Sequence, residues 1–150
     1  MRRLRFLALI VLVLGVVGCG SDGLKRVPVR GKLTAKGQAL GGAVIQFLPT
    51  GSTKGEGGIG RSDDDGNFTL TGSRAGEQGV VPGEYKVRVS RLVGRDGKVL
   101  GPDAKQADNP GAWESVPGSY ASINSPLQAT VPEEGGAVNL DVSEGLLRRK

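Results

Sequence analysis

The chain of 150 residues is long enough for one compact domain, because domains commonly span about 100–200 residues. Its 26 glycines and 8 prolines make 34 of 150 residues, which is about twice the average share and favours short strands and tight turns over helices. Histidine is absent and cysteine occurs once, which excludes histidine-based nucleophile chemistry and most zinc sites. The formal net charge of +5 excludes little until the charges are placed along the chain.

The amino terminus has the organisation of an export signal. Three arginines within the first five residues precede the apolar run Phe6–Val17. This run of 12 residues fits the length of about 7–15 that is usual for a signal-peptide core, and it is shorter than the 18 or so needed to cross a bilayer.

The run ends at Val16-Val17-Gly18-Cys19, which resembles the lipobox of bacterial lipoproteins. In that family the cysteine thiol is diacylglycerylated, the chain is cut just before it, and the new amino group is acylated. The resemblance implies that residues 1–18 are a lipoprotein signal peptide, that Cys19 holds the protein to membrane lipid, and that residues 19–26 are a lipidated leader. The alternatives are a plain secretory signal with an incidental cysteine, or an uncleaved anchor.

The positive charge lies at the two ends of the chain. Cleavage before Cys19 leaves 17 basic against 15 acidic residues. A basic tail, residues 144–150, ends in Arg148-Arg149-Lys150, and without this trio residues 19–147 have 14 basic and 15 acidic side chains. No basic domain face remains, so we expect no nucleic-acid partner. We expect the trio to be solvated, with contact to anionic headgroups as the alternative.

Apolar side chains at every second position predict a series of short strands. The expected inward-facing sets are Val27, Val29, Gly31 and Leu33; Ala43, Ile45 and Phe47; Phe68 and Leu70; Tyr85, Val87 and Val89; Leu127, Ala129 and Val131; and Val138, Leu140 and Val142. A further strand is expected near residues 59–62, and Gly135-Gly136 predicts the turn between the last two strands. No stretch has a sustained helical period, so the pattern predicts an all-β, antiparallel β-sandwich.

Two segments interrupt this pattern. Residues 50–60 are rich in glycine and are expected to form a loop. Residues 91–126 hold half of the prolines and are expected to form an irregular insert. Within the insert, Leu92-Val93 and Val99-Leu100 flank a turn-forming tetrapeptide and predict a small hairpin. A loop of this length in a compact domain is functional or disordered.

Two short motifs suggest ligands but are better explained as loop and turn. Gly55–Gly60 matches the letters of GxGxxG, but the residues that follow cannot begin the helix that would hold a pyrophosphate. The acidic segment at residues 63–67 fails the EF-hand spacing in both registers. It predicts a turn in which aspartates cap backbone amides and the glycine has positive φ. A weak cation site at Asp63 and Asp65 is the alternative, and no other metal or cofactor is expected.

Trp113 and Tyr120 are the two aromatic residues of the long insert. An aromatic side chain on a loop can stack on a sugar ring or anchor a partner. It can equally pin the loop onto the sandwich, because it buries a large apolar area. We favour pinning for both residues and keep Trp113 as the candidate ligand-binding residue.

The order of several motifs resembles that of carboxypeptidase-regulatory-like domains. The segments that carry the likeness are Val29–Leu33, Gly37–Phe47, Ser62–Phe68 and Pro82–Val89, with Val116–Tyr120 and Ser125–Val131 similar to the end of bacterial lipoproteins of this type. The resemblance covers residues 27–143 and implies a transthyretin-like, Ig-like β-sandwich of about seven strands. It also implies that the module has no catalytic residues, and that Tyr120 belongs to a structural signature.

Together these features predict a non-catalytic, lipid-anchored protein of the cell envelope, facing the periplasm or the cell surface. Its sandwich is expected to act as a structural or protein-interaction module. The alternative is an accessory module that binds envelope polysaccharide or peptidoglycan through Trp113 and the loop at residues 50–60. An enzyme is not expected.

Overall fold

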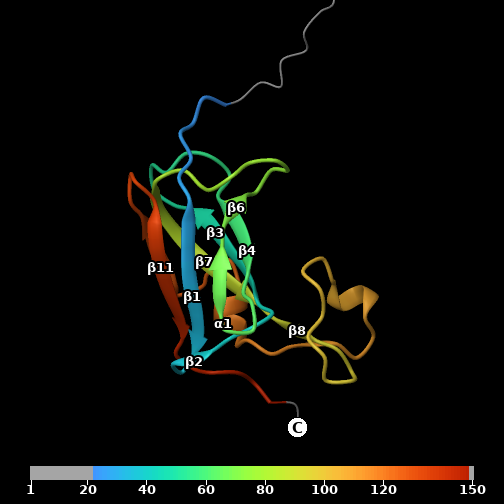
Figure 1. Cartoon of the computed structure of the whole chain (residues 1–150). Helices are drawn as coiled ribbons and strands as arrows, with labels where there is room; N and C mark the ends of the chain where they lie inside the picture. The colour runs from blue at the N-terminus through green and yellow to red at the C-terminus, as the bar shows by residue number, and fades with distance from the viewer. Residues whose placement is uncertain (1–21, 149–150) are drawn as a thin grey trace, which may run out of the picture.

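The computed structural model describes residues 22–148 as two β-sheets packed face to face, with an arm projecting from one end (Figure 1). Cys19, the expected signal peptide and the last two residues lie outside the described residues. Within residues 22–148, no helix is long and apolar enough to cross a bilayer. The strands are β1 (Val29–Ala35), β2 (Gln38–Ala39), β3 (Val44–Pro49), β4 (Gly58–Arg61), β5 (Asn67–Thr69), β6 (Thr71–Gly72), β7 (Gly83–Ser90), β8 (Leu92–Val93), β9 (Trp113–Glu114), β10 (Gln128–Val131) and β11 (Gly136–Val142), and the helical turns are η1 (Gln106–Asp108) and α1 (Gly118–Ala121).

The two sheets confirm the predicted all-β sandwich. One sheet has four strands, in the order β11-β1-β2 with β5 also paired to β1, and the other has five, in the order β10-β7-β3-β4-β6. The strand pairs are antiparallel except β1 and β11, which run parallel from Val29 opposite Gly136 to Ala35 opposite Val142. The expectation of a purely antiparallel sandwich is therefore wrong at this one pair.

The parallel pair follows from a turn that joins the two sheets. The turn lies where it was predicted, with Gly135 at φ +76° and its N–H donating to Pro132 O at 2.9 Å. However, β10 pairs with β7 and β11 pairs with β1, so the last two strands are not hydrogen-bonded neighbours. The chain also changes sheets at the buried Leu70, which divides the strand expected at residues 67–71 into β5 and β6.

The predicted inward-facing side chains form the core between the sheets. All of them are buried except Gly31, Leu127 and Val138, and the last two are partly buried against the same cluster. Phe47 and Tyr85 pack with their ring centroids 5.5 Å apart, and the Tyr85 hydroxyl donates to Val81 O at 2.5 Å. Burial raises the pKa of Tyr85, so the phenol stays neutral in the core. The period of two thus located the core.

Gly31 interrupts the inward row of β1 for a steric reason. It lies opposite Phe68 on β5 and opposite Val138 on β11. A Cβ at Gly31 would stand 1.9 Å from Val138 O and 2.5 Å from Phe68 Cζ. The missing side chain is the space that the Phe68 ring fills, so only glycine fits at the centre of this sheet.

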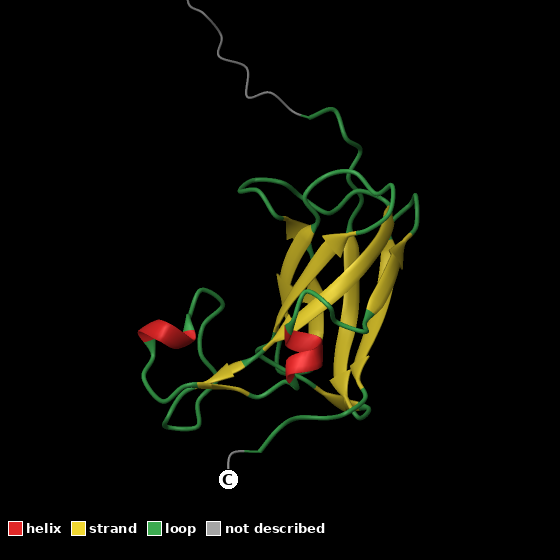
Figure 2. Ribbon diagram, turned by 180° about the vertical axis from the view of Figure 1, so that it is seen from behind, coloured by secondary structure: helices red, strands yellow, loops and turns green. Residues whose placement is uncertain are grey.

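The first part of the expected insert is an arm, residues 92–114, that leaves the sandwich after β7 (Figure 2). The strands β8 and β9 pair at its base, and η1 lies within it. The small hairpin predicted here forms, since Gly94 N donates to Lys98 O at 2.8 Å and Leu100 N donates to Leu92 O at 2.9 Å.

The second part of the expected insert, residues 115–126, is irregular except for the helical turn α1, but it is packed against the sandwich. Val116 is fully buried, and α1 packs against β7 with the Tyr120 side chain in the core. Proline density misled the prediction here, because Pro117 begins α1 as its N-cap residue and does not disrupt packing. The insert is therefore an arm followed by a segment that belongs to the sandwich.

Candidate functional site

A groove lies at the base of the arm, beside the last described residues of the chain. We call it the Trp113 groove and define it by six of its lining residues, which are Arg91, Val93, Arg95, Trp113, Leu146 and Leu147. Its volume is about 300 Å³, near the lower bound of small-ligand sites. Its walls come from β8, β9 and the carboxyl-terminal tail, which are far apart in the sequence.

The tail is held in place by the backbone of the arm's base. Leu147 N donates to Ser115 O at 2.8 Å, so the tail is bonded to the residue that follows β9. Leu146 and Leu147 stay 38% and 48% exposed, and they are two of the four exposed large apolar residues within residues 22–148. Neighbouring apolar side chains left in solvent beside a tryptophan form a small apolar surface that a partner can cover.

Glu114 fixes the base of the arm through three hydrogen bonds. Its carboxylate accepts from Ser90 Oγ at 2.6 Å, from Arg91 N at 2.7 Å and from Val116 N at 3.1 Å. These bonds hold the residues just before β8 and those just after β9 in one arrangement. Trp113, which precedes Glu114 on β9, is thereby placed on a fixed base and not on a free loop.

Arg91 lies half-buried in the groove without an acidic partner. Its Nε donates to Gly41 O at 2.8 Å and its Nη1 donates to Ser115 Oγ at 3.3 Å, and both acceptors are neutral. No carboxylate within residues 22–148 forms an ion pair with it. Burial lowers the pKa of the Arg91 guanidinium, with a smaller opposing effect from the Glu114 charge. The groove therefore contains a positive charge that is only partly compensated.

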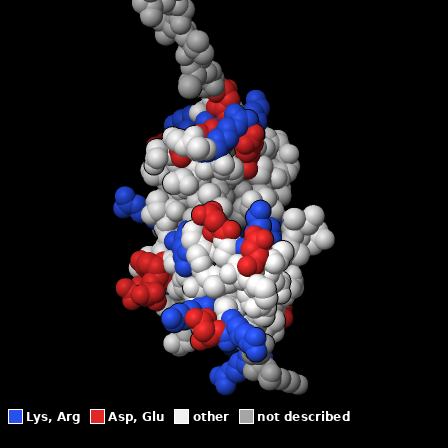
Figure 3. Space-filling model, turned by 90° about the vertical axis from the view of Figure 1, so that its right-hand side faces the viewer, with Lys and Arg blue, Asp and Glu red and all other residues white. Residues whose placement is uncertain are grey.

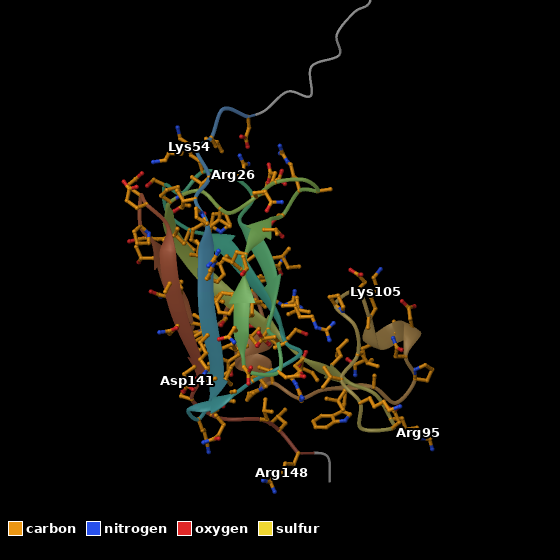
Figure 4. The ribbon with its side chains drawn as sticks, viewed as in Figure 1. Arg26, Lys54, Arg95, Lys105, Asp141 and Arg148 are labelled. Carbon is orange, nitrogen blue, oxygen red and sulfur yellow. The ribbon has the colours of Figure 1, made fainter. Side chains whose placement is uncertain are left out.

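Arg95 and Arg148 add exposed positive charge at the same end of the molecule. The aliphatic stem of Arg95 lies over Gly111, where a Cβ would stand 3.4 Å from Arg95 Cδ. Neither arginine forms an ion pair within residues 22–148. Figure 4 shows Arg95 on the arm and Arg148 below the sandwich, both away from the end that holds Arg26 and Lys54. In Figure 3, blue side chains lie at this end near the carboxyl terminus, with acidic side chains among them and beside them.

The two aromatic residues of the expected insert have different environments. Tyr120 is 4% exposed in the core and its hydroxyl shares a hydrogen bond of 2.8 Å with Ser143 Oγ, which confirms that it pins the segment to the sandwich. Trp113 is half-buried and keeps part of its ring at the groove surface, so ligand binding by Trp113 stays a prediction. Sequence analysis missed Leu146 and Leu147, although an apolar pair directly before a basic trio is a visible signal.

The acidic segment forms the predicted turn. Asp63 Oδ1 accepts from Asp65 N at 3.0 Å and from Asn67 N at 2.8 Å, and Gly66 has φ +81°. Asp63 therefore uses its carboxylate to close the turn. Within the described residues, no group of three or more acidic, cysteine or histidine side chains is placed to hold a metal ion.

The opposite end of the sandwich holds the leader in a network of ion pairs. Asp22 accepts from both terminal nitrogens of Arg26, at 2.9 and 2.7 Å, and Arg26 Nη2 also contacts Glu77 Oε1 at 2.6 Å. Arg74 and Glu56 form a further pair beside them. The hydrogen bond from Arg26 holds the pKa of Asp22 well below its usual range. We call these five residues the leader clamp.

The glycine-rich loop at residues 50–60 lies at this same end and leads into β4, not into a helix. Glu56 joins it to the leader clamp, and Thr53 Oγ1 accepts from Glu84 N at 2.8 Å. The loop is thus at the end away from Trp113, so the two candidate glycan-binding elements do not form one site (Figure 4). That part of the expectation is wrong.

No family model, curated protein or solved structure matches this chain. The likeness to carboxypeptidase-regulatory-like domains therefore depends on the sequence motifs quoted above. What the described residues establish is an all-β sandwich with ion-paired leader residues at one end and a basic, partly apolar groove at the other.

Proposed function

We propose that this chain is a non-catalytic, lipid-anchored protein of the cell envelope whose β-sandwich presents the Trp113 groove to a protein partner. The observation that carries the proposal is the placement of the leader clamp and the groove at opposite ends of the sandwich (Figure 4). A tether attached at one end leaves the other end free to meet a partner.

The leader clamp supports a close attachment to the membrane. Only three peptide units separate Cys19 from Asp22, a reach of about 10 Å in a fully extended chain. Asp22 and Arg26 are tied to the body of the sandwich through Glu77. Acyl chains on Cys19 would therefore hold the leader end near the headgroups and direct the groove away from them.

The composition of the groove supports binding over catalysis. Its charged lining residues are arginines, which do not exchange protons near neutral pH. Glu114, the acidic residue nearest to it in the chain, is occupied by three hydrogen bonds that position the backbone. General acid–base chemistry needs a pair of groups with separated proton affinities, and this groove does not offer one.

A glycan-binding module is the second candidate, favoured by the partly exposed ring of Trp113. The rest of the groove argues against it. Sugar hydroxyls need acceptors as well as donors, but no Asp, Glu, Asn or Gln side chain is among the described residues that line the groove. A protein partner therefore fits the groove better than a neutral polysaccharide.

Photo-crosslinking in the producing cell tests the proposal. A photoreactive residue at position 147, in the groove wall, should give a discrete crosslinked partner, and one at position 123, which is more exposed, should not. Cys19→Ser should prevent acylation and the cleavage that depends on it, so the chain should keep residues 1–18 and lack the added acyl mass. Equal crosslinking from both positions, or an acylated chain from Cys19→Ser, would contradict the proposal.

A further inference from the structure

Building on the proposed function, we infer that the Trp113 groove binds a protein segment in which carboxylates flank apolar side chains. The inference concerns the chemistry of the partner. It depends on the charge of the groove, its apolar floor, and the chemical groups that its walls lack.

The positive charge of the groove favours a carboxylate in the partner. Arg91 is half-buried and bonded only to the neutral acceptors Gly41 O and Ser115 Oγ. A guanidinium in a partly desolvated position gains most from an anion that approaches in its plane, and a carboxylate has the geometry to do so. Arg95 extends the same positive surface, and the nearby Asp96 is turned back onto its own loop, where it accepts from Lys98 N at 3.1 Å.

The apolar part of the groove calls for aliphatic or aromatic side chains in the partner. Val93 is buried beneath it, and Trp113, Leu146 and Leu147 form its walls. Covering exposed apolar area is favourable, so a partner gains by placing apolar groups over the two leucines. Tryptophan and arginine together are the residue types that most often dominate binding energy at interfaces.

The geometry favours a peptide segment over an anionic membrane. The site is a groove with a volume of about 300 Å³, which suits an inserted side chain better than a flat bilayer surface. It also lies at the end opposite the leader clamp (Figure 4). With acyl chains on Cys19, the groove would face away from the anchoring membrane. An acidic polysaccharide would satisfy the arginines but would leave Leu146 and Leu147 uncovered.

Intrinsic fluorescence reads the groove directly, because Trp113 is the only tryptophan of the chain. The full chain, purified in detergent, is titrated with the peptide Ac-Glu-Leu-Leu-Glu-NH2 up to about 5 mM, a range that covers weak peptide binding. The amide analogue Ac-Gln-Leu-Leu-Gln-NH2 is the matched ligand. Two further ligands are titrated separately. One is a vesicle that contains phosphatidylglycerol, and the other is an oligogalacturonate.

The acidic peptide should shift and saturate the Trp113 emission, and the amide analogue should not. Arg95→Gln should weaken binding about threefold, since it removes one exposed charge pair. Arg30→Gln, an exposed arginine on the outer face of β1, should leave binding unchanged. Raising the salt to about 1 M shortens the Debye length to about 3 Å and should reduce the affinity.

Each other outcome overturns the inference. Equal binding of both peptides would show that the carboxylates do not contribute to binding. No shift of the Trp113 emission with either peptide would show that the groove does not bind such a segment. A response to vesicles alone, or to oligogalacturonate alone, assigns the groove to a membrane or an acidic glycan. Should peptide binding fail while crosslinking from position 147 persists, the proposed function stands and only the acidic chemistry falls. If Cys19→Ser is still acylated while the peptide binds, the proposed anchor at Cys19 is wrong and the inferred chemistry of the groove stands.

Discussion

The backbone N–H of Leu147 donates to the carbonyl oxygen of Ser115 at 2.8 Å, which joins the carboxyl-terminal tail to the base of the arm. Through this bond the end of the chain becomes a wall of the groove that contains Trp113. The tail is thus part of the candidate site and not only a solvated extension. Its apolar pair, Leu146 and Leu147, contributes surface to the groove.

Removing the tail should open the groove without unfolding the sandwich. A chain that ends at Gly145 loses Leu146 and Leu147, which are 38% and 48% exposed and do not belong to the core between the sheets. We expect the Trp113 emission to move to longer wavelength and the unfolding midpoint to change little. Removing residues 148–150 alone keeps the wall and should leave the emission unchanged. A tail deletion that left the Trp113 spectrum unaltered would show that the leucines do not shield the ring.

Gly31→Ala should be among the most damaging substitutions in the sheet. The added Cβ would meet Val138 O at 1.9 Å and the Phe68 ring at 2.5 Å, so the β1–β11 or β1–β5 pairing must give way. We expect a loss of about 3 kcal/mol or more in the free energy of unfolding, measured with urea. Gly101→Ala is the control, since a Cβ there meets nothing within 4 Å. Similar losses at both positions would argue against the close approach.

Tyr120→Phe should remove the hydrogen bond to Ser143 Oγ and keep the packing of the ring. The expected loss is about 1 kcal/mol in the free energy of unfolding, and Ser143→Ala should cost a similar amount. Because the two groups share one bond, the double variant should lose less than the sum of the two singles. If the loss in the double variant equals the sum of the two single losses, Tyr120 and Ser143 do not share a stabilising bond.

Asp141 should make stability depend on pH. Its carboxylate accepts from Thr34 Oγ1 at 2.6 Å and from Gly37 N at 3.0 Å, and these bonds lower its pKa. A carboxyl group with a lowered pKa stabilises the fold above its unfolded value of about 4, and the contribution disappears as the pH falls through the folded pKa.

Asp141→Asn should therefore cost about 1 kcal/mol near pH 7, allowing for solvent screening, and less near pH 3. Urea unfolding at both pH values measures the difference. Asp108→Asn, at an exposed position in η1, is the control and should not change stability at either pH. If Asp141→Asn lowers the free energy of unfolding equally at both pH values, the charge of Asp141 does not contribute to stability.

The sequence predicted the core well because alternation is a local property. Val29, Ile45, Val87 and Leu140 face inward wherever their strands pair, so a period of two locates them without knowledge of the partners. Pairing itself is not local. The residues of β1 and β11 alone do not indicate that the two strands run parallel. The relative direction of the two strands depends on where the chain changes sheets.

The candidate site could be predicted only in part. The sequence indicated Trp113 as an aromatic residue in a long insert, but it gave no sign that Leu147 would bond to Ser115. That contact brings together residues 32 positions apart, and α1, β10 and β11 lie between them in the chain. The Asp63 turn shows the opposite case, because every bond that defines it lies within four residues.

The intact mass of the protein extracted from the membrane fraction tests the central claim most directly. The account predicts a chain that begins at Cys19 and carries the added mass of a diacylglyceryl group on the thiol and an acyl group on the new amino terminus. A chain that retains residues 1–18 with an unmodified Cys19 would contradict it.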